Sequence, residues 1–328
     1  MEARISEAFA PAAISNFFAI HDDGLGSPGF LDFSHVGATG GGFTLSKGVF
    51  TRVAVFDGSN EKRIRIKVNG DPNYRATTTR RAIELLVESA GLAFSSAEVE
   101  QWVEVPIGYG FGTSAASALS AVLAMSSALG LSLSRKRVAY YAHAADIICQ
   151  TGLGTVSSIW KHAGAGVIVR AGAPGVAKVV NVAVPQGLRV VAGLLAPFRK
   201  SEVLSSRLLR RRVNRYGEPA VLSVARNPTL DNLTREGEHF ARMLNLATPE
   251  IRRLVRLSLE NGAVSASQNM IGQAVHALVS EDKAEELAEA IRSDSSSPRV
   301  MVTDIGGTPA TTLEPGTRSY PATISSLG

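Results

Sequence analysis

VEVPIGYGFGTSAASALSAVLA, residues 103–124, is the stretch that decides the fold. Its first residues continue a run of alternating apolar and polar side chains, which predicts a strand ending at Pro106. A loop with three glycines follows, and Thr113 begins a run of small and apolar residues that predicts a long helix. A strand, a glycine-rich loop and a helix N-terminus in this order form an anion site, because glycine lets the backbone approach the anion and the first helical turn has free N–H groups.

The loop and the first helical turn supply the candidate phosphate-binding residues, which are Pro106, Gly108, Gly110, Gly112, Thr113, Ser114 and Ala115. Thr113 or Ser114 supplies a hydroxyl that can cap the helix or bind Mg²⁺ or a phosphate oxygen. The alternatives are a serine that only caps the helix and a loop that is only a tight turn. The run lacks the Gly-Lys-Ser/Thr of a Walker A loop and the early βαβ unit of a dinucleotide fingerprint.

Composition indicates a folded protein rather than a disordered tail. The chain has 328 residues, 45% hydrophobic and 19% charged, which suits two domains of roughly 150 residues each. The net charge of +5 suits an anionic ligand or an acidic partner. The single cysteine, Cys149, excludes an internal disulfide and a cysteine-rich zinc site.

No charge occurs in residues 105–134, which is long enough for most of a membrane span. Its serine and alanine content favours a buried helix instead. The N-terminus shows no secretion signal, so we expect a cytoplasmic protein with no membrane partner.

The pattern changes along the chain from strand-rich to helix-rich, with a boundary expected near residue 190. Two strands over 48–58 and 62–70 are expected to form a hairpin across Asp57-Gly58. The spacing of apolar residues predicts further elements: helices over 77–91, 113–129 and 135–148, strands within 164–195, and several helices after 198 with a strand over 298–306.

Pro106–Ala116 resembles the phosphate-binding motif of the GHMP kinases. Other stretches resemble the archaeal pantoate kinases within that superfamily: AFAPAAISNFFAIHDD (8–23), GATGGGFTLSKGVFTRVAV (37–55), YAHAADIICQTGLGTV (141–156), RAGAPG (170–175) and SASQNMIGQAV (265–275). The resemblance implies an α+β, two-domain GHMP-kinase fold. Residues 1–190 would form an ATP-binding domain like domain 2 of ribosomal protein S5, and residues 191–328 a ferredoxin-like α+β domain.

The resemblance also implies an ATP-dependent kinase that converts pantoate to 4-phosphopantoate in archaeal coenzyme A biosynthesis, acting as a homodimer. Ser114 and Asp146 would hold Mg²⁺, which prefers oxygen ligands. Thr155 stands where the family usually has a catalytic aspartate, Ala38-Thr39 where it has Ser-Arg, and Asp146 where it has Glu. The alternatives are a GHMP kinase for another small hydroxy acid or alcohol, and a non-catalytic nucleotide-binding homologue.

Four residues are candidates for binding the acceptor: His21, Thr39, His143 and Arg170. Arg170 is suited to a bidentate pair with a carboxylate, although a surface arginine at a strand end is an equal alternative. His143 is an equally good candidate for a satisfied, buried histidine. A further cluster, Arg207, Arg210, Arg211, Arg212 and Arg215, has no aromatic platform, so a solvated face or an acidic partner is favoured over nucleic acid.

Overall fold

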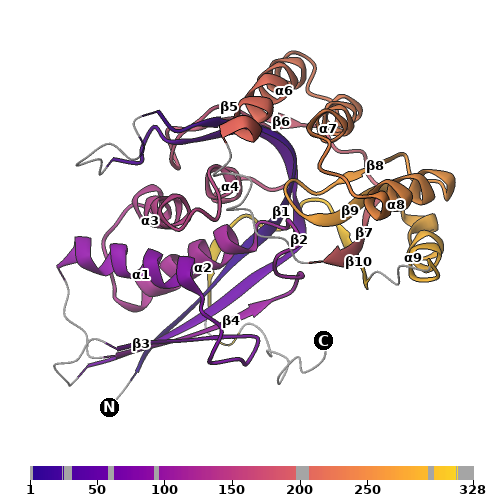
Figure 1. Ribbon diagram of the computed structural model, residues 1–328. Helices are drawn as coiled ribbons and strands as arrows, with labels where there is room; N and C mark the ends of the chain where they lie inside the picture. Colours follow the sequence, from indigo (N-terminus) through magenta and orange to yellow (C-terminus); the bar gives the residue numbers. More distant parts are fainter. Residues whose placement is uncertain are drawn as a thin grey trace.

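The computed structural model describes residues 3–23, 25, 32–57, 63–91, 96–196, 207–294, 299–314 and 316. Its strands form two sheets, and helices cover both (Figure 1). The first sheet contains β1 (Arg4–His21), β2 (Gly37–Phe56), β3 (Arg63–Val68), β4 (Ser96–Val103), β5 (Ala165–Arg170), β6 (Lys178–Val182) and β11 (Thr311–Leu313). The second contains β7 (Leu188–Ala196), β8 (Ser265–Gln268), β9 (Gln273–Ser280) and β10 (Arg299–Asp304).

A long antiparallel ribbon of β1 and β2 organises the first sheet. The pairing runs from Arg4 opposite Val55 to His21 opposite Gly37, with register shifts near residues 11–13 and 15–17. One half of β2 pairs with β4, and the other half pairs with β5, which continues to β6. The ribbon therefore bends and spans two regions of the molecule (Figure 1), as β-bulges allow.

The predicted hairpin between the second and third strands is wrong. β4 lies between β2 and β3, antiparallel to the former and parallel to the latter. Parallel neighbours need a crossover, and α1 (Thr77–Ala90) provides it while burying Ala82, Ile83 and Leu86. The burial of this helix decides which strands pair, and the turn signal at Asp57-Gly58 gave no information about it. Residues 58–62, where that turn was expected, lie outside the described residues.

The predicted helix over residues 113–129 is confirmed as α2 (Thr113–Ala128), which is buried along most of its length. It packs against the β1–β2 ribbon, α1 and α3 (Arg135–Ile148). Its small side chains allow this close packing, which explains the uncharged stretch around it. Among the described residues, no helix is both long and apolar enough to cross a membrane. The short helix α4 (Thr155–Ile159) was not predicted.

The second sheet has the order β10-β7-β9-β8, all antiparallel. In chain order this is 4-1-3-2, the arrangement of a ferredoxin-like domain, so the predicted fold class is confirmed. The described helices are α6 (Arg207–Arg226), α7 (Leu230–Leu244), α8 (Pro249–Glu260) and α9 (Ala284–Arg292), with the 3₁₀ turn η1 (Glu281–Lys283) before α9. The expected boundary near residue 190 falls inside β7.

The second sheet is buried on both faces. Alternate residues of β7 point to different cores: Val190 and Ala192 belong to the core shared with the first sheet, and Val191 to the core under α8 and α9. After the second sheet the chain returns to the first domain, where β11 pairs with β1 at the edge of the first sheet. The two domains are thus joined by a continuous apolar contact as well as by the chain.

Candidate functional site

The glycine-rich loop leads into the N-terminus of α2, as predicted. The helix N-cap is Gly112, and no side chain caps the first turn. The N–H groups of that turn therefore remain available to an anion. Gly108, Gly110 and Gly112 have φ angles of 89°, 85° and 63°, a region that other residues rarely adopt.

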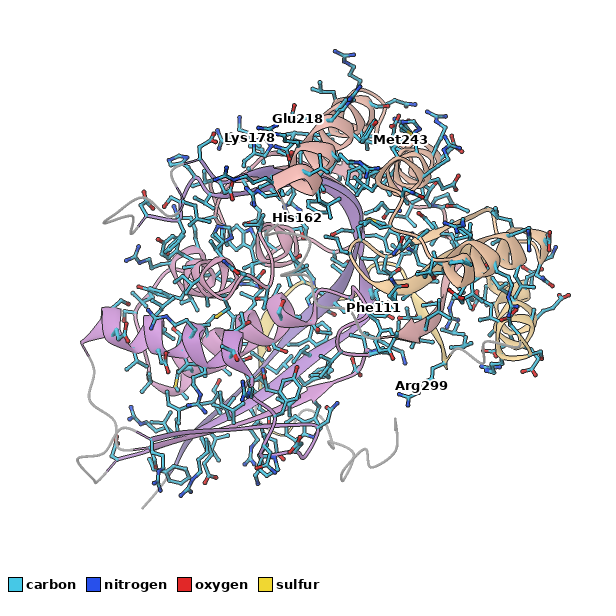
Figure 2. All side chains as sticks on the ribbon, viewed as in Figure 1. Phe111, His162, Lys178, Glu218, Met243 and Arg299 are labelled. Atoms are coloured by element: carbon cyan, nitrogen blue, oxygen red, sulfur yellow. The ribbon has the colours of Figure 1, made fainter. Side chains whose placement is uncertain are left out.

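Neighbouring segments press closely on this loop. A β-carbon at Gly110 would lie 2.9 Å from Cβ of Asn269, and one at Gly112 would lie 2.8 Å from Cγ2 of Thr155. Phe111 is buried where the two domains meet (Figure 2), and its carbonyl accepts a hydrogen bond of 3.0 Å from Ala13 N. The loop is therefore held between β1, the start of α4 and the second domain.

Ser114 and Asp146 lie together, although 32 positions separate them. Asp146 is 1% exposed on α3, and Ser114 Oγ donates to its Oδ1 at 3.1 Å. Thr151 Oγ1 donates to the same oxygen at 2.6 Å and lies 3.0 Å from the hydroxyl of Thr78. The alternative of an exposed helix acid is thereby wrong for Asp146, as is the N-cap alternative for Ser114. No pattern in the sequence pointed to Thr78.

This cluster fits a small hard cation. Its donors are a carboxylate and hydroxyl oxygens, the ligand type that Mg²⁺ prefers. A β-carbon at Gly152 would overlap Asp146 Oδ2, so the backbone approaches the carboxylate closely on that side. Within the described ranges no three His, Cys, Asp or Glu side chains converge on one point. A cation here would therefore depend on other oxygens, such as those of phosphates, for the rest of its ligands.

A cavity of about 690 Å³ opens beside the loop, a volume within the usual range for small-molecule sites. Its walls include Gly108, Gly110, Gly112, Thr113 and Ser114, together with the segment Tyr74–Thr79 and residues 149–151. The segment Tyr74–Thr79 contains the start of α1, whose N-cap, Ala76, also makes no side-chain cap. Two helix N-termini thus face one cavity, and only that of α2 was predicted to bind an anion.

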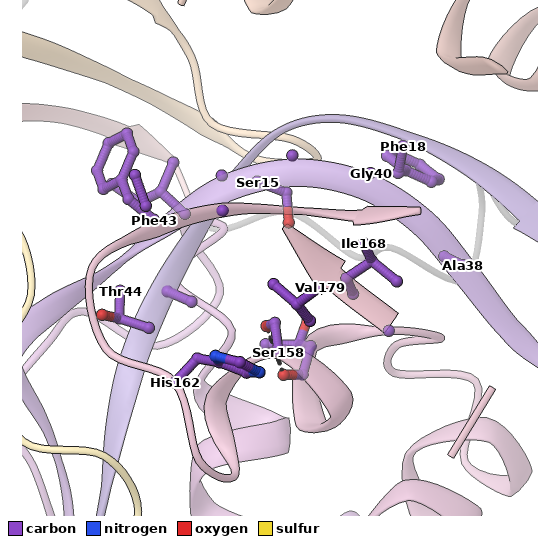
Figure 3. Close-up of a pocket in the computed structure, with 18 of the residues that line it drawn as sticks. Ser15, Phe18, Ala38, Gly40, Phe43, Thr44, Ser158, His162, Ile168 and Val179 are labelled. Carbon is purple, nitrogen blue, oxygen red and sulfur yellow. Dashed lines mark hydrogen bonds between the residues drawn. The ribbon is translucent and has the colours of Figure 1, made fainter. Parts of the chain in front are cut away.

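A second cavity lies between the β2–β5–β6 part of the first sheet and α4 (Figure 3). Gly40, Gly41 and Gly42 form one wall, and Thr155 and Ser158 of α4 lie opposite. Residue 151 lines the first cavity, and residues 152–155 line the second. The two cavities therefore adjoin at the segment 151–155, beside Gly112.

The predicted acceptor-binding residues are only partly brought together. Thr39 lines the second cavity, and its Oγ1 lies 3.0 Å from Nε2 of His21. Asp22, the next residue, pairs with Arg210 at 2.6 Å. His21 and Thr39 thus close one end of the β1–β2 ribbon near this cavity.

His143 and Arg170 have other contacts in the structure. His143 is 1% exposed, and its Nε2 donates to the carbonyls of Val36 and Phe33 at 2.9 and 3.2 Å. Burial lowers its pKa to about 4, so the ring is neutral near pH 7. Arg170 Nε donates to the carbonyl of Val176 at 2.9 Å. Neither residue lines the second cavity, so their predicted contact with a substrate has no support here.

A buried polar chain joins the second domain to the glycine-rich loop. Asn16 Nδ2 donates to Nε2 of His276 at 3.1 Å, and His276 Nδ1 donates to Oδ1 of Asn269 at 2.9 Å. Asn269 Nδ2 then donates to the carbonyl of Tyr109 at 3.1 Å. Burial lowers the pKa of His276 to about 3, which keeps the ring neutral with its proton on Nδ1. No sequence pattern assigned a role to any of these residues.

The arginine cluster on α6 is partly used within the chain. Arg210 pairs with Asp22, and Arg212 Nη2 donates to the carbonyl of Met243 at 2.6 Å. The guanidinium carbon of Arg215 lies 5.7 Å from the ring centre of Tyr216. These contacts favour a structural role over a surface for nucleic acid.

Two family models match the chain, the GHMP kinases N terminal domain over residues 77–159 and the GHMP kinases C terminal domain over residues 227–296. The first match contains the glycine-rich loop, Asp146 and Thr155. The second contains Asn269 and His276.

Curated relatives extend the similarity over most of the chain. A pantoate kinase of Thermococcus kodakarensis is 30% identical, covering 89% of this chain and 93% of the relative. A pantoate kinase of Methanospirillum hungatei is 28% identical, covering 85% and 89%. The solved structure of a phosphotransferase related to the CoA biosynthesis pathway matches with a TM-score of 0.81 and 26% identity, covering 94% of this chain and 98% of its own.

Proposed function

The chain belongs to the GHMP kinase family, and we propose that it is a pantoate kinase, which transfers the terminal phosphoryl group of ATP to a hydroxyl of pantoate. Similarity to curated pantoate kinases over almost the whole chain supports the acceptor. We further propose that the product serves coenzyme A biosynthesis, because the phosphotransferase of similar structure is related to that pathway.

The observation that carries the proposal is the junction of the two cavities. The larger one is lined by Ser114 and two helix N-termini, which suit a triphosphate. The second one begins at Gly152 and is lined by apolar residues together with several hydroxyls, Asn181 and His162, which suits a small hydroxy acid. A donor and an acceptor bound in these cavities would meet beside Gly112 and Thr155.

The residues at the junction act mainly by positioning and by stabilising charge. Phosphoryl transfer has a loose transition state whose charge lies on the phosphoryl oxygens. The free N–H groups of α2 and its dipole would stabilise that charge. We assign Ser114 and Asp146 as the residues that would hold Mg²⁺, with Thr151 orienting the carboxylate. When bound, the cation would offset negative charge on the phosphates.

Thr155 changes which group can accept the proton of the acceptor hydroxyl. It stands at the junction, with its methyl group toward Gly112, and it cannot act as a carboxylate base. The acceptor hydroxyl would then lose its proton to a phosphate oxygen or to water. General-base help contributes roughly 10²–10⁴-fold to a rate, so we expect a slower kinase rather than an inactive protein. A cytoplasmic homodimer remains a prediction, and size-exclusion chromatography can test the dimer.

A coupled assay of ADP release with pantoate, homoserine and mevalonate tests the proposal. We expect turnover with pantoate and a product heavier by one phosphoryl group in mass spectrometry. Turnover with another acceptor alone would contradict the pantoate assignment and support the second kinase hypothesis. Calorimetric binding of ATP without turnover of any acceptor would support the non-catalytic homologue, because Thr155 has replaced the usual carboxylate.

A further inference from the structure

We propose that Asn269 and His276, which belong to the second domain, are positioning residues for the phosphate site. They orient the peptide bond between Tyr109 and Gly110 so that its N–H is directed at the phosphates of ATP. The inference rests on the proposed function and adds to it a contribution of the second domain to binding of the donor. The sequence placed every candidate phosphate-binding residue within 106–115, in the first domain.

The orientation of one peptide bond carries the inference. Asn269 Nδ2 donates to the carbonyl of Tyr109 at 3.1 Å. In a planar trans peptide the C=O and the N–H point in opposite directions, so the N–H of Gly110 is directed away from Asn269. Gly110 lines the larger cavity, and Tyr109 is not among the described residues that do so. Within the described part of the chain the N–H of Gly110 forms no hydrogen bond, which leaves it available to a phosphate oxygen.

The turn that carries Asn269 lies directly against this peptide bond. A β-carbon at Gly272 would lie 2.6 Å from the carbonyl oxygen of Tyr109 and 3.0 Å from the nitrogen of Gly110. A β-carbon at Gly110 would in turn lie 2.9 Å from Cβ of Asn269. Rotation of the peptide would therefore meet the backbone of the turn, and it would also separate the Tyr109 oxygen from its donor.

His276 fixes which end of the Asn269 amide faces Tyr109. Its Nδ1 lies 2.9 Å from Oδ1 of Asn269, and its Nε2 lies 3.1 Å from Nδ2 of Asn16. A proton on Nδ1 lets each of these contacts be a hydrogen bond, with Asn16 as the first donor and the Tyr109 carbonyl as the last acceptor. The opposite tautomer would turn the oxygen of Asn269 toward the oxygen of Tyr109. The chain therefore transmits one direction of donation to the loop.

The relay is also anchored before any ligand binds. Asn269 N donates to the carbonyl of Ala274 at 2.9 Å, which closes the turn between β8 and β9. Met270 N donates to the carbonyl of Ser15 at 3.0 Å, which joins the turn to β1, the strand that also carries Asn16. Asn269, His276 and Asn16 are all fully buried. A peptide held in this way loses little further freedom when the phosphates bind.

The experiment compares two ligands that differ in their phosphates. Isothermal titration calorimetry measures the affinity for ATP with Mg²⁺, and competition calorimetry measures the affinity for adenosine, which has no phosphate. Neither measurement needs an acceptor. Asn269→Leu removes the donor to Tyr109. His276→Phe keeps a ring against Phe43 but removes both nitrogens, and His276→Asn keeps an N–H near the position of Nδ1.

Asn232→Leu is the matched control. Asn232 is likewise a buried asparagine of the second domain, 1% exposed on α7. Its Nδ2 donates to the carbonyls of Ser223 and Asn227 at 3.1 and 3.0 Å, and it lines neither cavity. Urea unfolding of every variant measures the loss of stability, so that binding can be compared between variants of similar stability.

We expect Asn269→Leu to weaken binding of ATP by about 10- to 100-fold, the usual range for a lost hydrogen bond to a charged group. His276→Phe should weaken it by about 3- to 10-fold, since Asn269 keeps its donor but loses the bond that orients it. His276→Asn should restore most of that loss. The affinity for adenosine should change little in all three variants, and Asn232→Leu should lose stability while binding ATP as the wild type does.

Unchanged ATP affinity in Asn269→Leu overturns the inference. Equal losses for ATP and adenosine also overturn it, as does a comparable loss of ATP affinity in Asn232→Leu, since either result would indicate general damage to the fold. If Asn269→Leu does not fold, the two His276 variants decide, and equal ATP affinity in both overturns the inference. A wild type that does not bind ATP overturns the proposed function first, which distinguishes the two failures.

Discussion

Replacement of Gly110 by alanine should weaken ATP binding far more than a matched replacement elsewhere. Gly110 has φ of 85°, and Gly130, just after α2, has φ of 64°. An alanine at either position adopts a left-handed backbone, which costs about 1–2 kcal/mol. Nothing lies within 4 Å of a β-carbon at Gly130, whereas one at Gly110 meets Asn269 at 2.9 Å. Gly130→Ala therefore isolates the backbone cost.

The additional contact at Gly110 displaces the loop from its position. Asn269 cannot retreat without loss, because it bonds both His276 and the carbonyl of Tyr109. Leaving one such buried group unpaired costs about 1–3 kcal/mol. If the loop moves instead, its N–H groups no longer point at the phosphates. We expect a loss in ATP affinity of about 10- to 100-fold, equivalent to about 1.4–2.7 kcal/mol.

Isothermal titration calorimetry with ATP and Mg²⁺ measures the affinity, and urea unfolding measures the stability of both variants. Gly130→Ala should lose stability while binding ATP as the wild type does. Gly110→Ala should lose both. If Gly110→Ala binds ATP with wild-type affinity, the loop does not hold the phosphates and the reasoning from its geometry is refuted.

Three further predictions concern the junction and the buried histidines. Ser114→Ala should lower kcat by about 10²–10³-fold but destabilise the fold by only about 1 kcal/mol, as steady-state kinetics and urea unfolding can establish; full activity would remove Ser114 from the site. Thr155→Asp should raise kcat by roughly 10-fold or more at little cost in stability, since an aspartate in the first turn of α4 suits the helix dipole; an unchanged or lower rate in the coupled assay would contradict kinase geometry at this position. His143 and His276 have pKa values lowered by burial from 6.5 to about 4 and about 3. The unfolded chain therefore takes up protons that the folded chain rejects, so the free energy of unfolding should be fully retained above pH 6.5 and fall by about 2 kcal/mol per histidine by pH 5; equal urea midpoints at pH 7.5 and 5 would contradict this.

Local sequence patterns were enough to predict the structure of segments that act through their own backbone. The helices beginning at Thr77, Thr113 and Arg135 start at their predicted residues, because the spacing of apolar side chains is a property of neighbouring residues. The glycine-rich loop belongs to the same class, since its φ angles and the free N–H groups of α2 follow from residues 106–116. Similarity to a known family then supplied the remote partner Asp146, which no spacing rule connects to Ser114.

Only the tertiary structure decided which distant segments meet. β4 lies between β2 and β3 because α1, which is buried beside α2 and α3, provides the crossover between two parallel strands, and this arrangement outweighs the nearby turn signal. The chain from Asn16 through His276 to Asn269 joins residues far apart in sequence, each of which is ordinary by itself. The second cavity arises for the same reason, since residues of β2, β5, β6 and α4, which are far apart in the sequence, line it together. The sequence specifies the chemistry of each side chain. The exclusion of solvent that gives a side chain its role arises only when these elements pack together.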